Sequence, residues 1–267
     1  MTNAQSWLLL EYRDDLPEKL YRLGGNPDPY RLFDGTELAS CADQSPLLLS
    51  VAENPSLMAG FLMQPHDWAG LQIDSAQPLP NVLQHLRHIL FIGFDCSRKG
   101  ILRYSNPRTA SYFFPALGGG DLPLWLGPIR RLSWYGATWR ESAAQQAHWY
   151  CQENPHADQW QAVAGQKSFV LDKWHTQALQ RQQTEKFLFH WWQKQSSLSF
   201  TEAFGYLEEG MASGFLSADS LSAYLEIRSA HRSTMPPITL PQGSDDVRLN
   251  HLEISLERSA TDKESHA

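Results

Sequence analysis

Short apolar runs separated by turn residues fill the first half of the chain, and they restrict its fold more than any other feature. The runs are WLLLEY (residues 7–12), LLLSV (47–51), WAGLQI (68–73) and FIGF (91–94). Each has the length of a buried strand and is bounded by polar, Gly- or Pro-containing segments. Segments with helical spacing lie between them, such as PNVLQHLRHIL (80–90). This alternation predicts an α/β, that is a mixed α+β, lobe with a small sheet over residues 1–135.

The second half of the chain changes character. Residues 141–154 and 171–195 are helical in composition, and Ser199 with Glu202 fits a capping box that begins a further helix. Ser217 is expected to cap another helix that reaches about His231. We therefore predict an all-helical lobe over residues 136–235. Residues 236–267 are polar and are predicted as a tail, either partly disordered or adding a strand at LEISL (252–256).

Composition excludes several classes of protein. The formal net charge is −7 and no long basic run interrupts it, which argues against nucleic-acid binding. The start of the chain lacks a basic segment and a small-residue cleavage site, and no apolar run approaches the ~20 residues that span a membrane. We expect a cytoplasmic protein that does not insert into membranes. The three cysteines, Cys41, Cys96 and Cys151, are widely spaced and are expected to be free thiols.

Motifs that carry chemistry are missing from the sequence. It contains no nucleophile elbow, no dinucleotide-binding or P-loop glycine pattern and no HExxH, and the triple glycine at 118–120 does not lead into GK[ST]. His85 and His88 have helical spacing that could chelate a metal, but no third ligand follows at short range. We therefore expect no catalytic residue, no metal site and no cofactor, and predict that the protein is not an enzyme.

Two arginines lie in an unusual place, in the segment RYSNPRTASYFFPAL (103–117). Asn106 is a good helix N-cap, Pro107 suits the first helical position, and Pro115 predicts a kink or an early end. Arg103 and Arg108 therefore flank a helix N-terminus, where the helix dipole disfavours positive charge. Each needs a compensating group: a buried carboxylate, backbone carbonyls, or an acidic group of a partner.

Several segments in order resemble the type VI secretion effector chaperone/adaptor family. ILRYSNPRTASYFFPAL followed by LWLGPIRRL (124–132) is similar to that family's R-F-Y-D-P-R segment, helix and F-G-P-I segment. LLLEYRDD (8–15), PYRLFDGT (29–36), SPLLLSV (45–51) and LQHLRHILFI (83–92) fall where the family has comparable elements. LEEGMASGFLSADSLSAYLEI (207–227) resembles its helical lobe. The chain departs from the family at Ser105 and at Asn106, which replaces an aspartate, and this disfavours an essential acid there.

The resemblance implies a non-catalytic cytoplasmic adaptor. Such a protein would bind a cognate type VI effector, commonly through a segment near the effector's N-terminus, and help load it onto the VgrG spike. We expect a partner-binding groove between the lobes, formed by two segments, residues 103–108 and residues 127–129. Its expected residues are Arg103, Tyr104, Asn106, Pro107, Arg108, Gly127, Pro128 and Ile129.

Two other functions remain open from the sequence. An immunity protein would bind the catalytic domain of a toxin tightly and rescue intoxicated cells. A hydrolase with an unrecognised site could use His85 or His148. The three functions differ in what the purified protein binds and whether it turns over a small molecule.

Overall fold

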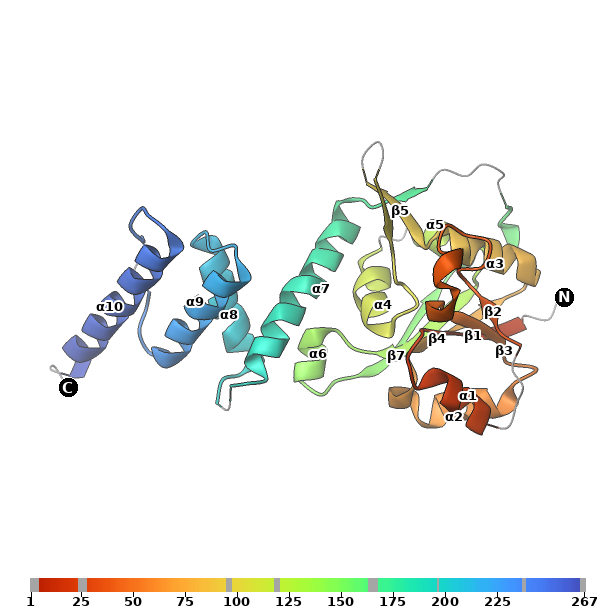
Figure 1. Cartoon of the computed structure of the whole chain (residues 1–267), viewed down its shortest axis with the longest axis horizontal. Helices are drawn as coiled ribbons and strands as arrows, with labels where there is room; N and C mark the ends of the chain where they lie inside the picture. The colour runs from red at the N-terminus through yellow and green to blue at the C-terminus, as the bar shows by residue number, and fades with distance from the viewer. Residues whose placement is uncertain are drawn as a thin grey trace. The chain divides into compact units, whose positions relative to one another are not determined.

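The computed structural model describes residues 5–23, 28–94, 98–117, 121–162, 168–195, 197–236 and 239–264. Cys96 and the triple glycine at 118–120 lie outside these residues. The chain forms two compact units, residues 1–182 and 183–267. The fold is mixed α and β, with the sheets in the first unit and helices in the second, as the sequence predicts (Figure 1).

A six-stranded antiparallel sheet organises the described part of the first unit. Its spatial order is β2 (Tyr30–Arg31), β3 (Leu47–Ser50), β1 (Gln5–Leu10), β4 (Gly70–Ser75), β7 (Arg131–Gly136) and β8 (His148–Glu153). Strands β1, β3 and β4 correspond to three of the predicted apolar runs. Strand β1 is central because it pairs with both β3 and β4.

Side chains of β1 alternate between two cores, because successive residues of a strand face opposite sides of a sheet. Trp7 and Leu9 join a large cluster with helices α3 (Leu79–His88), α4 (Pro107–Phe113) and α5 (Leu122–Leu126). Leu8 and Leu10 join a second cluster with α1 (Leu16–Arg22) and α2 (Pro55–Met63). Figure 1 shows α1 and α2 on one side of the sheet and α3 and α5 on the other. The unit is therefore a three-layer sandwich with the sheet in the middle.

A smaller sheet of three strands completes the first unit. Its order is β6 (Arg98–Ile101), β5 (Phe91–Phe94) and β9 (Phe169–Val170), with β5 and β6 antiparallel and β5 and β9 parallel. Short 3₁₀ helices cover residues Ala39–Gln44, Pro65–Asp67, Phe114–Ala116 and Ala157–Gln159. The third of these begins where α4 ends, next to Pro115, which confirms the predicted early end of that helix.

The predicted boundary at residue 135 is wrong, because it falls within strand β7 and the sheet continues into β8. Residues 141–154, predicted as helix, form the end of the short helix α6 (Trp139–Ala143) and the whole of β8. Strand β8 pairs only with β7 among the described strands, and all six of its side chains are exposed or half-buried. An edge strand of this kind carries little hydrophobic alternation, so its sequence gives a weak strand signal.

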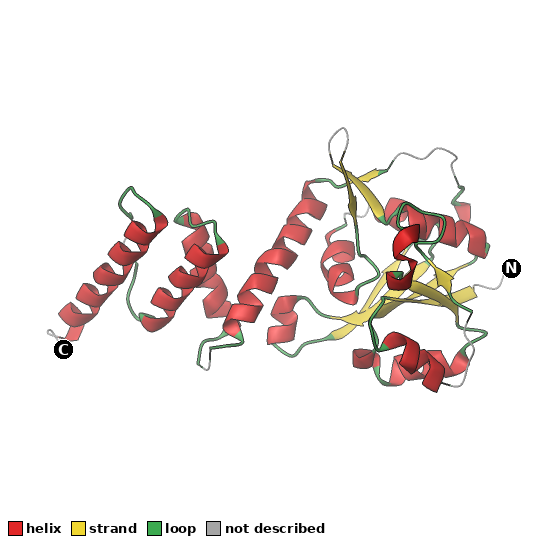
Figure 2. Ribbon diagram, in the orientation of Figure 1, coloured by secondary structure: helices red, strands yellow, loops and turns green. Residues whose placement is uncertain are grey.

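The second unit consists of helices in its described residues (Figure 2). Helix α7 (Lys173–Trp192) contains the boundary between the units and is followed by α8 (Phe200–Ala212), α9 (Ala218–Ala230) and α10 (Asp245–Glu264). Ser199 and Glu202 form the predicted capping box of α8. Helices α8 and α9 approach closely at Gly210, where a Cβ atom would lie 2.9 Å from the Tyr224 ring.

The predicted tail is wrong, because most of it forms helix α10. The buried residues Leu249, Leu252 and Leu256 recur at intervals of three and four, which is helical spacing, whereas Ile254 is exposed. The apolar alternation in LEISL suggested a strand only because Ile254 lies between the two leucines. Ile254 is exposed, so the alternation does not mark one buried face. Among the described residues, none of the helices combines the length and the apolar character needed to cross a bilayer.

Candidate functional site

Arg103 is compensated by a buried carboxylate. Its Nε donates to Glu11 Oε1 over 2.7 Å, and its Nη2 contacts the same oxygen. The other carboxylate oxygen of Glu11 accepts a hydrogen bond from Ser105 Oγ. The Glu11 side chain is 3% exposed and that of Arg103 is 63% exposed. The pair therefore joins the end of β1 to the segment that precedes α4, and it leaves part of the Arg103 side chain at the surface.

Arg108 is compensated by backbone carbonyls, another of the predicted arrangements. Its Nη1 donates to Ala137 O (2.8 Å), Thr138 O (2.7 Å) and Ser142 Oγ (2.6 Å). Its guanidinium also lies 4.1 Å from the centre of the Trp139 ring, a cation–π contact. Arg108 therefore fixes α4 against α6 and the turn before it.

The remaining residues predicted to bind a partner divide by burial. Asn106 is half-buried and caps α4, its Oδ1 accepting a hydrogen bond from Arg108 N over 2.9 Å. Five are buried: Tyr104, Pro107, Gly127, Pro128 and Ile129. These five residues have little accessible surface in this structure. A contact of any of the eight residues with a partner stays a prediction.

The two predicted segments meet around His85. Tyr104 donates its hydroxyl to Leu86 O over 2.8 Å, and Asn154 Nδ2 donates to Gly127 O over 2.8 Å. Gly127 has φ +53°, and a Cβ atom there would lie 2.4 Å from the His85 ring. Glycine is therefore required at this turn both by its backbone conformation and by the adjacent imidazole.

His85 is a core residue. Its side chain is buried and its Nε2 lies 2.9 Å from Trp125 O. Burial lowers the pKa of His85 to about 4, so the ring is neutral at neutral pH and Nε2 donates the hydrogen bond. His148, the other candidate base, is exposed on β8, with its Nδ1 3.0 Å from Gln146 O. Neither residue is among those that line the recess described below. Within the described ranges, no three His, Cys, Asp or Glu side chains are grouped to hold a metal ion.

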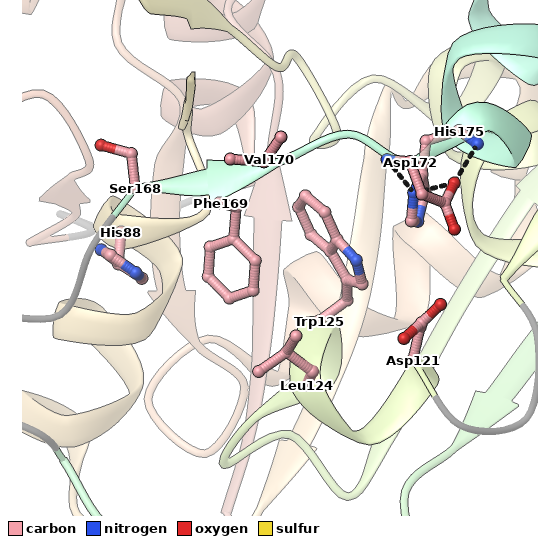
Figure 3. A pocket seen from close by; sticks show the side chains of 9 residues that line it. All are labelled: His88, Asp121, Leu124, Trp125, Ser168, Phe169, Val170, Asp172 and His175. Carbon is pink, nitrogen blue, oxygen red and sulfur yellow. Dashed lines mark hydrogen bonds and ion pairs between the residues drawn. The ribbon is translucent and has the colours of Figure 1, made fainter. Parts of the chain in front are cut away.

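A recess of about 300 Å³ opens beside His88, between α5 and the segment that joins β9 to α7. Figure 3 shows Phe169 and Trp125 between His88 at one end and Asp172 with His175 at the other. Leu124 and Val170 are 54% and 69% exposed, so apolar surface is accessible there. The residues that line the recess are His88, Asp121, Leu124, Trp125, Ser168, Phe169, Val170, Asp172 and His175.

Asp172 and His175 form a fixed pair at one end of this recess. The Asp172 carboxylate accepts a hydrogen bond from the His175 backbone N–H over 2.9 Å, which places it as a cap at the start of α7. The same carboxylate oxygen lies 2.7 Å from His175 Nδ1. The backbone N–H and then the imidazole of His175 lower the pKa of Asp172, so this group stays ionised.

The His175 ring is oriented by its neighbours. It stacks on Phe113 with centroids 4.9 Å apart and lies 5.1 Å from the Trp125 ring. The Asp172 backbone N–H lies 3.3 Å from His175 Nδ1, and the Asp172 carboxylate lies 2.7 Å from the same nitrogen. His175 Nε2 is buried and has no hydrogen-bond partner among the described residues.

The recess can bind hydrogen-bond donors. It presents two aspartates, and its lining includes no lysine or arginine among the described residues. Ser168 also lines it, but Figure 3 shows this side chain near His88, at the opposite end from His175. A nucleophile must lie within hydrogen-bond reach of its base, so Ser168 and His175 do not form a nucleophilic pair.

Sequence reasoning missed this recess. Its residues come from three separate segments, 88, 121–125 and 168–175, which the parallel pairing of β5 with β9 brings together. The D-x-x-H spacing of Asp172 and His175 was the one available signal, since an aspartate N-cap with a histidine at the third helical position places both side chains close together.

Comparisons with known proteins give one match. No curated protein sequence and no solved structure matches the chain. Residues 6–122 match the model of a family described as a domain of unknown function, DUF4123. The matched region extends from β1 to the start of α5, and it contains Glu11, Arg103 and Asn106.

Proposed function

We propose that this chain is a non-catalytic cytoplasmic adaptor that binds a cognate type VI secretion effector and helps load it onto the VgrG spike. The observation that carries the proposal is the match of residues 6–122 to DUF4123, a family associated with type VI effector adaptors. The segments that resemble the adaptor family at residues 8–15, 29–36, 45–51, 83–92 and 101–117 all lie within that match.

The side-chain geometry supports binding over catalysis. Arg103 and Arg108 are held by a carboxylate and by carbonyls that belong to the fold. His85, a candidate base, is buried with its Nε2 bonded to Trp125 O. The accessible recess has apolar walls and several acceptors, a combination suited to holding a polypeptide side chain.

The first experiment tests binding and delivery together. The chain is expressed with the toxin encoded beside its gene, and co-purification is measured with the full-length toxin and with the toxin lacking its N-terminal region. An adaptor captures the first and not the second. In the parent bacterium, deletion of the adaptor gene is expected to abolish delivery of this toxin while leaving delivery of unrelated effectors intact.

Two results would contradict the proposal. The first is capture of the isolated catalytic domain of the toxin together with rescue of intoxicated cells, which indicates an immunity protein. The second is turnover of an ester, amide or phosphoester substrate by the purified chain, abolished by a single polar substitution, which indicates an enzyme.

A further inference from the structure

The recess at Asp121, Asp172 and His175 has the chemistry of a cation site. Asp121 is exposed at the start of α5, and its side chain makes no cap hydrogen bond to that helix. Asp172 is ionised and partly exposed, with 39% of its side chain accessible. Two negative groups with no basic residue in the described lining favour a positively charged occupant.

The unpartnered Nε2 of His175 is a second, independent observation that points to a polar ligand. His175 is 2% exposed, and a buried polar atom without a partner destabilises a fold unless something supplies one. A polar group that enters the recess can supply the partner that Nε2 lacks. A donor-rich group also satisfies the two carboxylates.

The walls of the recess select among cations. Trp125 and Phe169 present aromatic rings whose centroids lie 4.4 Å apart, and Leu124 and Val170 add exposed aliphatic surface. A guanidinium stacks on aromatic rings and spans two carboxylates, whereas its three-carbon stem packs on aliphatic side chains. These properties match an arginine better than Ca²⁺ or Mg²⁺, which prefer oxygen ligands. Within the described residues, the carboxylates and imidazoles are not grouped to hold a metal ion.

The recess also adjoins a strand edge. Strand β9, which carries Phe169 and Val170, pairs with β5 on one side, and no described strand pairs with its other side. Unpaired backbone groups at such an edge can hydrogen-bond an extended peptide. This neighbour favours an arginine within a polypeptide over a free amine.

We propose that the recess binds an arginine side chain carried by an extended, apolar segment of the partner polypeptide. The inference rests on the proposed function, since the partner is the effector, and it names the part of the effector that is recognised. The guanidinium faces Asp121 and Asp172, while the flanking residues lie along β9.

The test uses the full chain and two tripeptides. Acetyl-valyl-arginyl-valine amide is titrated into the protein and followed by ¹H–¹⁵N NMR, with the citrulline peptide, which is neutral and nearly isosteric, as the matched ligand. The arginine peptide is expected to shift resonances of residues 121–125 and 168–175, and the citrulline peptide to bind about tenfold more weakly. No shift at these residues, or equal binding of both peptides, overturns the proposal.

Variants provide a second measurement. Asp121→Asn removes one carboxylate without removing a cap, and is expected to weaken the arginine peptide about tenfold. Asp14→Asn makes the same charge change at an exposed site outside the recess and should leave binding unchanged. An equal effect of the two variants would show that only net charge matters and would overturn the site.

Capture of the effector by wild type and by Asp121→Asn tests the arginine site separately from the proposed adaptor function. If wild-type protein captures the effector and Asp121→Asn captures it equally well, the adaptor function stands and the arginine site is wrong. If wild-type protein captures no effector while the arginine peptide still shifts the recess, the site stands and the proposed function is wrong.

Discussion

Glu11 and Arg103 lie 92 residues apart in sequence and form an ion pair whose carboxylate is buried and whose guanidinium is largely exposed. The pair connects the central strand of the sheet to the segment before α4. Removing one member of such a pair leaves a charge without its partner, and this is most unfavourable for the buried member. The arginine therefore has a structural role that is separable from any role in binding a partner.

Replacement of Arg103 tests that separation. Arg103→Ala leaves the Glu11 carboxylate buried with the Ser105 hydroxyl, and we expect the free energy of unfolding to fall by about 2 kcal/mol. Arg13→Ala removes a more exposed pair with Asp15 and should cost less than about 1 kcal/mol. Urea denaturation of the three proteins measures both changes.

The double variant Glu11→Gln/Arg103→Ala provides the control for the ion pair. It removes the buried charge together with its partner, so its stability should recover part of the loss seen in Arg103→Ala. If the double variant is less stable than Arg103→Ala by the full effect of Glu11→Gln alone, the two residues are not coupled.

We expect Gly→Ala substitutions at Gly127 and at Gly205 to have opposite effects on the stability of the chain. Gly127→Ala places a methyl group against the His85 ring at a positive φ, and we expect a loss of about 3 kcal/mol or more. Gly205→Ala lies within α8, where a Cβ atom meets nothing within 4 Å, and should stabilise the chain by about 0.5–1 kcal/mol. Thermal unfolding by circular dichroism compares them. Similar melting temperatures for the two variants would contradict the close packing at His85.

Substitutions of Asn106 test whether an amide or a carboxylate is preferred at this helix N-cap. As an N-cap, Asn106 accepts the Arg108 N–H, so Asn106→Ala should destabilise the chain by about 1 kcal/mol. Asn106→Asp keeps an acceptor and adds a negative charge at a helix N-terminus, so it should be neutral or stabilising by up to about 0.5 kcal/mol. Urea denaturation distinguishes these outcomes. A marked loss in Asn106→Asp would show that the neutral amide is required there.

Local patterns in the sequence predict the first unit well where burial is two-sided. LLL in β1 is apolar on both faces, and both faces are covered, so the run alone indicates a central strand. The sequence of the edge strand β8 has no such pattern. The place of β8 in the sheet depends on its pairing with β7. In α10, two patterns overlap in the sequence: a short apolar alternation and the helical spacing of Leu249, Leu252 and Leu256. The structure follows the helical spacing, which is the longer pattern.

The site was less predictable because it depends on which segments meet. The position of Arg103 and Arg108 at a helix N-terminus predicts that each needs a compensating group, and the structure supplies a carboxylate for one and carbonyls for the other. Neither partner is local in sequence. The recess likewise requires Asp121 and His175 to come together, and no periodic pattern records a contact over that separation.

His85 predicts a pH dependence of stability. Burial lowers its pKa from 6.5 to about 4, with His88 also lowering it and the hydrogen bond to Trp125 O opposing. Between these values the unfolded chain binds a proton that the folded chain excludes. The free energy of unfolding therefore has its full His85 contribution above pH 6.5 and loses it as the pH falls toward 4, by at most about 3 kcal/mol.

His85→Gln isolates this contribution from those of the carboxylates. Glutamine can still donate to Trp125 O but does not titrate, so the difference in stability between wild type and variant should narrow as the pH falls from 6.5 to 4. His148→Gln, which changes an exposed histidine on β8, is measured beside it as the control substitution. Urea denaturation at a series of pH values gives the three curves. If the His85→Gln curve is parallel to the wild type, the imidazole is not held neutral by the fold.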